Sequence, residues 1–431
     1  MEVRPGYKMT EVGVIPEDWL TVPLSQTARR ISRGASPRPI DSTVWFDERS
    51  GVGWVRISDV TKSYRYLTET SQRLSEAGVA HSRFVSSGSL IMSICATVGR
   101  SVETRIDACI HDGFVVFEQP TCDQSFLYHV LARLEPTWGK TGQTGSQMNL
   151  NTSLINARLI TLPRSQVEQR IIASALTDVD ELLFGLDRLI AKKRDLKQAA
   201  MQQLLTGKIR LGGFNGEWEV KTLGDLFAFS GGYSASRDQL STKGHCYLHY
   251  GDIHGAAKTC VDTRADFQDI PKIDIPLKLV SPGSLLQDGD VVFVDASEDD
   301  EGTSRHVVVA NKGGLPFIAG LHTIVAKGKT NELAHEYRRY CFQTAAIRAQ
   351  FLFYAVGTKV SGISKSNIPK LTIPIPSLPE QRAIAAVLSD MDAELAALEV
   401  RRDKTRALKQ GMMQELLTGK TRLVPAGGVN A

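Results

Sequence analysis

Few residues in this sequence have types and spacings that could do chemistry. The acidic run Glu298-Asp299-Asp300-Glu301 could hold a divalent metal ion, as in a nuclease. Blocks of like charge are more often solvated loops, so we favour a loop here. Cys109 and His111, near Cys95, lack the paired short spacings that zinc requires, and a buried strand explains them better. We therefore expect no metal site.

Two Gly-Lys-Thr segments, at residues 139–141 and 419–421, could suggest a phosphate-binding loop. Such a loop needs a further glycine five residues earlier, where this chain has Leu134 and Gln414. No G-x-G-x-x-G follows a predicted strand, and no Asn-Pro-Pro-Tyr-like segment of an amino-methyltransferase is present. We therefore expect no nucleotide or methyl-donor cofactor on this chain.

Basic and amide side chains in loops are the stronger candidates for function. Arg and Lys can bond to phosphates and guanine edges, and Gln and Asn can pair with adenine in the major groove. Any one of them could be an ordinary solvated residue, but they recur at matching places in the two halves of the chain. The candidate DNA-contacting residues are Arg56, Ser58, Lys62, Arg65, Gln143, Thr144, Gln147, Asn149, His249, Lys359, Ser361 and Lys365.

An internal repeat supplies the elements that must position these loops. Residues 168–211 align without a gap on residues 380–423, and about half of the paired positions are identical. Apolar residues recur at steps of three and four in both copies, which predicts helices with a buried stripe. The first copy has one row of Ile172, Leu176, Val179, Leu183, Leu186 and Ile190 and a second row of Leu182, Leu189 and Leu196.

Each copy of the repeat contains about forty residues, which at about 1.5 Å per residue predicts a helix on the order of 60 Å long. Such a helix needs a partner for its apolar stripe. The obvious partner is the other copy, which predicts an antiparallel coiled coil.

The remaining sequence also repeats, in a more diverged form. Residues 54–60 are echoed by residues 247–253, and residues 88–92 by residues 289–293. We expect an α+β protein with similar mixed α/β globular domains at 1–162 and 212–374, long helices within 163–211 and 375–424, and a flexible tail over 425–431. Closely matched helices and diverged domains suggest that the helices do one shared job and the domains do two versions of another.

Composition is that of an ordinary globular protein. The 431 residues are 42% hydrophobic and 23% charged, with a net charge of +4. No apolar run is long enough to cross a membrane, and the first residues lack the apolar core of a signal peptide, so we expect a cytoplasmic protein. Six scattered cysteines fit reduced thiols. Any nucleic-acid site would need basic residues gathered on one face.

Three short motifs occur in a duplicated order. They are Leu378-Pro379-Glu380-Gln381-Arg382, degenerate as Gln166-Val167-Glu168-Gln169-Arg170; paired Leu-Leu-Thr-Gly-Lys segments at 204–208 and 416–420; and Ile15-Pro16-Glu17-Asp18-Trp19. In this order the chain resembles the specificity (S) subunits of type I restriction-modification systems, over nearly its whole length.

The resemblance implies two target recognition domains, each reading one half of a split DNA site in the major groove, with the helices as a ruler between them. Because the two domains differ, the site would be asymmetric. The resemblance also implies that the helices bind two modification subunits, which methylate adenine, and that a restriction subunit can join. S-adenosylmethionine, ATP and magnesium would then be needed only on those partners. Candidate subunit-interface residues are Glu168, Gln169, Arg170, Glu380, Gln381 and Arg382.

Two alternatives stay open at this point. A metal-dependent nuclease would use Asp299, Asp300 and Glu301, and a coiled-coil scaffold would bind no DNA. The ruler hypothesis makes its own prediction: an insertion at Thr206-Gly207-Lys208 should change the gap between half-sites and leave each half-site unchanged.

Overall fold

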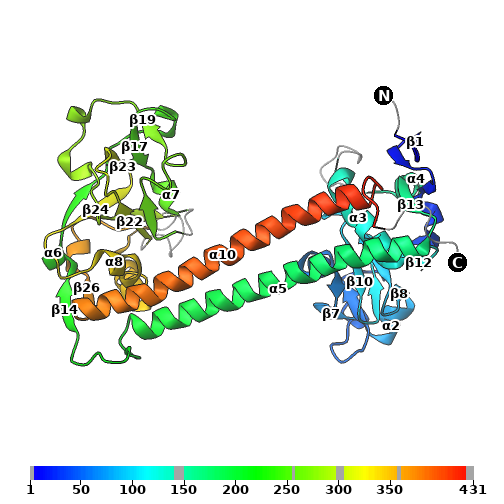
Figure 1. Cartoon of the computed structure of the whole chain (residues 1–431). Coiled ribbons are helices and arrows are strands. Elements are labelled where there is room, and N and C mark those ends of the chain that lie inside the picture. The colour runs from blue at the N-terminus through cyan, green and yellow to red at the C-terminus, as the bar shows by residue number, and fades with distance from the viewer. Residues whose placement is uncertain (1–3, 140–149, 255–257, 298–304, 357–360, 424–431) are drawn as a thin grey trace. The chain divides into compact units, whose positions relative to one another are not determined.

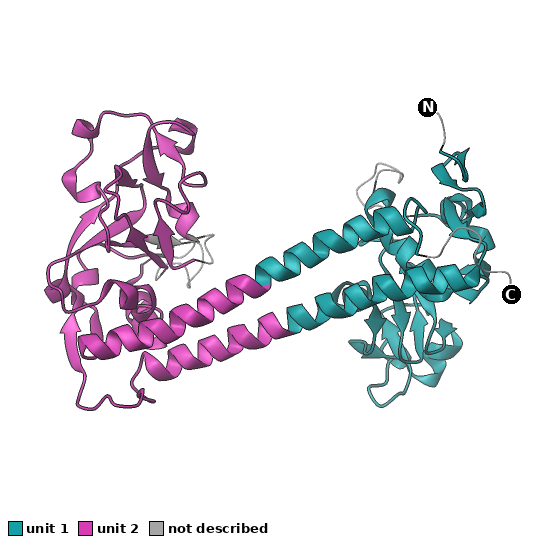
Figure 2. Ribbon diagram, in the orientation of Figure 1, with its two compact units in different colours: residues 1–188, 399–431 teal, residues 189–398 magenta. Residues whose placement is uncertain are grey.

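The structure is a computed structural model that describes residues 4–139, 150–254, 258–297, 305–356 and 361–423 (Figure 1). The chain divides into two compact units (Figure 2). Unit 1 is Met1–Arg188 with Glu399–Ala431, and unit 2 is Leu189–Leu398. Each of the two long helices, α5 (Gln166–Leu204) and α10 (Leu378–Leu416), therefore contributes to both units. Within the described residues, no helix is both long and apolar enough to cross a membrane.

Two larger sheets and four α-helices, besides the long ones, form most of the described part of unit 1. The five-stranded sheet has the order β4 (Ala28–Arg33), β12 (Phe114–Pro120), β9 (Leu90–Ser93), β10 (Ser101–Thr104) and β6 (Tyr66–Leu67). The four-stranded sheet has the order β7 (Gln72–Arg73), β5 (Gly53–Val55), β11 (Ala108–Ile110) and β8 (Arg83–Val85). The helices are α1 (Ile57–Lys62), α2 (Glu76–Ala80), α3 (Gln124–Trp138) and α4 (Thr152–Ala157).

The five-stranded sheet is buried on both faces, because apolar residues of its central strands point to both sides. Successive side chains of a strand point to opposite faces. Leu90 and Met92 of β9 accordingly pack in the core that includes residues of α3 and α5, whereas Ile91 packs in a second core with residues of the four-stranded sheet. In β12, Phe117 packs in the first of these cores and Val116 in the second.

Unit 2 repeats this plan. Its larger sheet has the order β15 (Phe227–Gly231), β24 (Thr323–Gly328), β20 (Val291–Val294), β22 (His306–Ala310) and β18 (Cys260–Asp262). Its smaller sheet has the order β16 (Leu240–Ser241), β19 (Lys272–Ile273), β17 (His245–Leu248) and β23 (Phe317–Ala319). The helices are α6 (Leu223–Leu226), α7 (Tyr250–His254), α8 (His335–Cys341) and α9 (Ala345–Tyr354).

The sequence echoes correspond to equivalent elements in the two units. β5 leads into α1 in unit 1 and β17 leads into α7 in unit 2, and each of these strands pairs in parallel with one neighbour, β11 or β23. Val291 and Val292 of β20 divide between two cores, as Leu90 and Ile91 do. Outside these sheets, β13 (Leu159–Pro163) pairs with β3 (Trp19–Pro23) just before α5, and β26 (Thr372–Ile375) pairs with β14 (Glu219–Thr222) just before α10.

Two further pairs of short strands complete the description. β1 (Tyr7–Thr10) pairs with β2 (Gly13–Pro16) in unit 1, and β21 (Ala296–Ser297) pairs with β25 (Ser361–Gly362) in unit 2. All six cysteines of the chain lie among the described residues and are unpaired thiols.

Helices α5 and α10 run antiparallel within each unit. In unit 1, Lys409 Nζ lies 2.5 Å from Asp180 Oδ1, and Arg402 Nη1 lies 3.8 Å from Asp187 Oδ1. In unit 2, Lys193 Nζ lies 2.7 Å from Glu394 Oε1. In these pairs the residue numbers on α10 fall as those on α5 rise, as expected for antiparallel helices. The ion pairs connect the two helices at several positions along their length.

The apolar rows on α5 do not share one environment. Ile172, Leu176, Leu183, Leu186 and Ile190 are all buried, as the periodicity predicts. The second row is exposed: Leu182, Leu189 and Leu196 expose 42%, 39% and 47% of their surface. The expectation that both rows are buried is therefore wrong, because the buried stripe of α5 is only one row wide.

Each long helix ends in the unit opposite to the one in which it begins. Leu204 and Leu205, at the end of α5, pack in the core of unit 2, and Leu416 and Leu417, at the end of α10, pack in the core of unit 1. A glycine in the left-handed region, with φ of +69°, follows each helix and reverses the chain. Both ends of both helices are thus anchored in apolar cores.

Candidate functional site

The glutamates of the two Glu-Gln-Arg motifs form ion pairs inside the chain. Glu168 is 1% exposed, and its Oε1 and Oε2 accept bonds from Arg422 Nε and Nη2 at 2.9 and 2.7 Å. Glu380 is equally buried and binds Arg210 through both oxygens, with Nη2 to Oε2 at 2.7 Å. Each glutamate at the start of one helix thus holds the arginine just beyond the end of the other.

The glutamines of the same motifs join each helix to its globular domain. Gln169 Nε2 donates to the Pro163 carbonyl at 2.8 Å, and its Oε1 accepts from the Asp123 backbone N–H at 2.8 Å. Gln381 donates to the Pro376 carbonyl and accepts from the Ala334 N–H, also at 2.8 Å.

Four of the six candidate interface residues are therefore structural, which corrects the expectation from sequence. Glu168, Gln169, Glu380 and Gln381 are buried and occupied, so they cannot meet a second subunit. The exposed members of the set are Arg170 and Arg382.

A second pair of contacts between a long helix and its globular domain lies further along each helix. In unit 1, Asp180 binds Lys409 and lies 3.8 Å from the fully buried ring of His129 on α3. Burial, with Arg65 and Lys409 nearby, lowers the pKa of His129 to about 3, so this histidine is neutral. In unit 2, Asp392 binds Lys197 and accepts a 2.8 Å bond from the Tyr340 hydroxyl. Both units contain the same aspartate–lysine pair, but the residue of the globular domain that contacts the aspartate is His129 in unit 1 and Tyr340 in unit 2.

Three of the candidate DNA contacts lie at α1. Ser58 and Lys62 are exposed, and Arg56 is partly exposed. The helix is held by Asp59, which accepts bonds from the backbone N–H of Arg56 at 2.9 Å and of Ser71 at 3.2 Å. The structure thus keeps these side chains available at a fixed turn.

Arg65 is a wrong prediction. It is 5% exposed, and its Nη2 lies 2.6 Å from Glu103 Oε1, in an ion pair that is itself buried. Further 2.6 Å bonds reach the hydroxyls of Thr177 on α5 and Ser125 on α3. A guanidinium occupied on all sides cannot bind DNA, and Arg65 instead links the domain to the long helix.

His249 in unit 2 is likewise buried, at 8% exposure. Its Nδ1 accepts a 3.0 Å bond from the Gly251 N–H, and burial together with Arg237 lowers its pKa, which favours the neutral ring. His249 therefore orders the turn before α7, and we withdraw it as a DNA contact. Lys365 is exposed.

The structure does not describe the side chains of the other candidates. Gln143, Thr144, Gln147, Asn149 and Lys359 lie outside the described residues, as does the acidic run 298–301, and the side chain of Ser361 is not described. Among the residues that are described, no group of three or more His, Cys, Asp or Glu side chains could hold a metal ion.

Sequence reasoning missed a basic edge strand in unit 1. β4 is at the edge of its sheet and exposes Arg29, Arg30 and Arg33. Arg33 Nε donates to the Asp112 carbonyl at 2.6 Å, and Arg29 Nη1 lies 3.3 Å from Gln119 Oε1. The equivalent strand of unit 2, β15, has the sequence Phe-Ala-Phe-Ser-Gly and no basic residue. Three arginines within six residues were the available signal.

Comparison with known proteins relates the chain to one family. Residues 215–405 match the family described as the type I restriction modification DNA specificity domain. A Methanocaldococcus jannaschii protein, named as a candidate specificity subunit of type I restriction enzyme MjaX, is 22% identical over 97% of both chains. The MjaIX specificity subunit of the same organism is 18% identical over 97% of this chain and 96% of its own.

Solved structures share the fold. The S subunit of a type I restriction-modification system from M. genitalium covers 96% of this chain and 98% of its own, with a TM-score of 0.56 and 14% identity. A chain from a structural study of type I complex assembly covers 94% and 99%, with a TM-score of 0.57 and 17% identity.

Residues 215–405 thus belong to the type I restriction modification DNA specificity domain family, and the chain is similar over nearly its whole length to specificity subunits of type I restriction enzymes. It is a DNA-recognition subunit and not an enzyme, as its family defines, and the nuclease alternative is not favoured.

Proposed function

We propose that each globular part reads one half of a split, asymmetric DNA site, and that α5 and α10 form an antiparallel coiled coil that sets the gap between the halves. The observation that carries this proposal is the repetition of one two-sheet framework with different side chains at equivalent positions. Arg29, Arg30 and Arg33 in unit 1 stand where unit 2 has Phe227, Ala228 and Gly231, by the register of their strand pairs. Two different readers require two different half-sites.

The recognition domains in this proposal are residues 1–162 and 212–374. In the first, Arg29 and Arg30 contact phosphates, while Ser58 and Lys62 at α1 approach the groove. Phosphate contacts fix the position of a protein on DNA, and contacts to base edges distinguish sequences. In the second domain, Lys365 is the exposed basic candidate.

The partners in this proposal are two modification subunits, and a restriction subunit can join them. The relatives are named as specificity subunits of type I restriction enzymes, and one structural neighbour comes from a study of complex assembly in such a system. S-adenosylmethionine, ATP and magnesium act on those partners. Exposed apolar residues on the helices, such as Val167 and Ile171 in unit 1 and Leu196 in unit 2, offer docking area.

The test is to express the chain with its modification subunit and map methylated adenines across a genome by single-molecule sequencing. The proposal expects one two-part motif with a constant unspecified gap and unlike halves. A stable complex that methylates no such motif would instead favour the scaffold hypothesis.

A further inference from the structure

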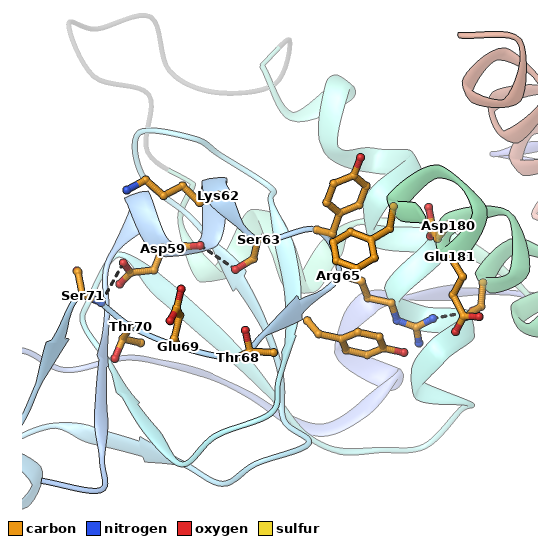
Figure 3. A pocket seen from close by; sticks show the side chains of 14 residues that line it. Asp59, Lys62, Ser63, Arg65, Thr68, Glu69, Thr70, Ser71, Asp180 and Glu181 are labelled. Atoms are coloured by element: carbon orange, nitrogen blue, oxygen red, sulfur yellow. Dashed lines mark hydrogen bonds between the residues drawn. The ribbon is translucent and has the colours of Figure 1, made fainter. Parts of the chain in front are cut away.

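Unit 1 contains a cleft for which the proposed function uses only one lining residue, Lys62. It has a volume of about 620 Å³ and lies between α5 and the segment from α1 to β7 (Figure 3). We call it the aromatic cleft, because Tyr64, Tyr66 and Phe184 line it. Its walls come from the recognition domain and from the long helix, so an occupant would contact both.

Two of the three rings are exposed. Tyr64 and Phe184 expose 38% and 44% of their surface, and their rings meet edge to face with centroids 5.2 Å apart. The ring of Tyr66 is covered on one side by the Arg105 guanidinium, 4.0 Å from its centroid. Exposed aromatic rings beside a cavity are a common anchor point at protein interfaces, because burying them removes a large apolar area from water.

The charges around the cleft indicate which kind of partner fits. Arg65 is neutralised by Glu103, and Asp180 by Lys409. The Asp59 carboxylate accepts hydrogen bonds from two backbone N–H groups. Glu69, Glu181 and Lys62 then remain as exposed charges in the lining, and in the described part of the chain neither glutamate has a cation within 4 Å.

Among the lining side chains the excess charge is therefore negative, while two guanidinium groups outside the lining, those of Arg105 and Arg188, lie over the rings of Tyr66 and Phe184. Figure 3 shows the two glutamates on different elements, Glu69 on the loop after β6 and Glu181 on α5. A negative rim repels DNA phosphates. It complements a protein segment in which an apolar side chain is followed by Lys or Arg.

The second repeat does not reproduce this lining. The residues equivalent to Glu181 and Phe184, 212 positions further on, are Ala393 and Ala396. Neither the ring nor the carboxylate recurs at the equivalent positions of the second copy, so α10 does not provide an equivalent wall.

We propose that the aromatic cleft docks a segment of one modification subunit that inserts an apolar side chain and places a Lys or Arg near Glu69 and Glu181. This inference rests on the proposed function and extends it: the two modification subunits bind the chain unequally, because only one of them can occupy the cleft.

Photo-cross-linking tests the occupant directly. The photoreactive residue p-benzoylphenylalanine replaces Phe184 in the chain assembled with its modification subunit and a target DNA duplex, and mass spectrometry identifies what is joined to it. The expected product is a basic, apolar peptide of the modification subunit. Cross-links to DNA, or none at all, would overturn the proposal. The matched control places the same residue at Ala396, which is also exposed, and should not give this product.

Affinity measurements separate this inference from the function on which it rests. Phe184→Ala and Glu181→Lys should each weaken the binding of one modification subunit about tenfold, the loss typical of an interface anchor. Ala393→Lys should change nothing. If Phe184→Ala binds with unchanged affinity while the complex still methylates a split motif, the docking proposal fails alone. If the native complex methylates no split motif, the proposed function fails.

Discussion

Lengthening α5 and α10 together tests whether the helix pair sets the gap between half-sites. The insertion points are the boundaries of the two units, between Arg188 and Leu189 in α5 and between Leu398 and Glu399 in α10. Seven added residues in each helix extend it by about 10.5 Å, at about 1.5 Å per residue. Seven residues are nearly two turns, so the buried row stays in phase to about 20°.

The expected result is a gap about three base pairs longer, because base pairs stack about 3.4 Å apart. The half-sites themselves should not change. The assay is methylation of a DNA library in which the two half-sites are separated by every gap over a range of lengths. An assembled double-insertion complex that keeps the original gap would refute the ruler argument.

Insertion into one helix alone is the control. Unit 1 holds both helices through the Asp180–Lys409 pair, and unit 2 holds both through Lys197 and Asp392. A seven-residue mismatch between helices that are anchored at both ends breaks one set of these contacts, so this variant should be destabilised.

The structure also changes the earlier expectation for an insertion at residues 206–208. Leu205 on one side of this segment packs in the core of unit 2, and Arg210 on the other side is bound to Glu380 in the same unit. Extra residues there would bulge outward without lengthening α5. We now expect the gap to stay the same in such a variant.

Three further predictions follow from single contacts. Arg422→Ala should lower the free energy of unfolding by about 3 kcal/mol, measured by urea denaturation, because it leaves the buried Glu168 carboxylate unpaired. Arg29→Ala and Arg30→Ala should each weaken DNA binding without changing the methylated sequence, and each should reduce the slope of log affinity against log salt by about one. The pKa of His129 is about 3 in the folded chain and near 6.5 when unfolded, so the unfolded chain binds the extra proton between these values and stability falls as pH falls from about 6.5. His129→Phe should flatten the stability curve in that window.

Matched variants control each of these experiments. Arg170→Ala removes an exposed arginine and should change the free energy of unfolding by less than about 0.5 kcal/mol. Arg49→Ala removes an exposed arginine of the same domain outside β4 and should leave the salt slope unchanged. An equal loss in each variant and its control would contradict the assigned contacts. A His129→Phe variant with the native pH dependence would show that this histidine is not responsible.

The sequence alone determined the repeat, the two long helices and the correspondence between segments of the two globular domains. These features depend on local periodicity and on the similarity of the two copies, which are visible without coordinates. The buried row Ile172, Leu176 and Leu183 was predictable for the same reason.

Only the tertiary structure showed which side chains already form hydrogen bonds or ion pairs within the chain. Glu168 meets Arg422, 254 residues away, and Arg65 meets Glu103 and Thr177, so residues that looked available for partners hold the chain together. Periodicity shows that a helix has an apolar stripe but not how wide a face its partner covers, and for that reason Leu182 was misjudged. Burial and pairing depend on contacts between distant segments, and these are set by packing and not by local sequence.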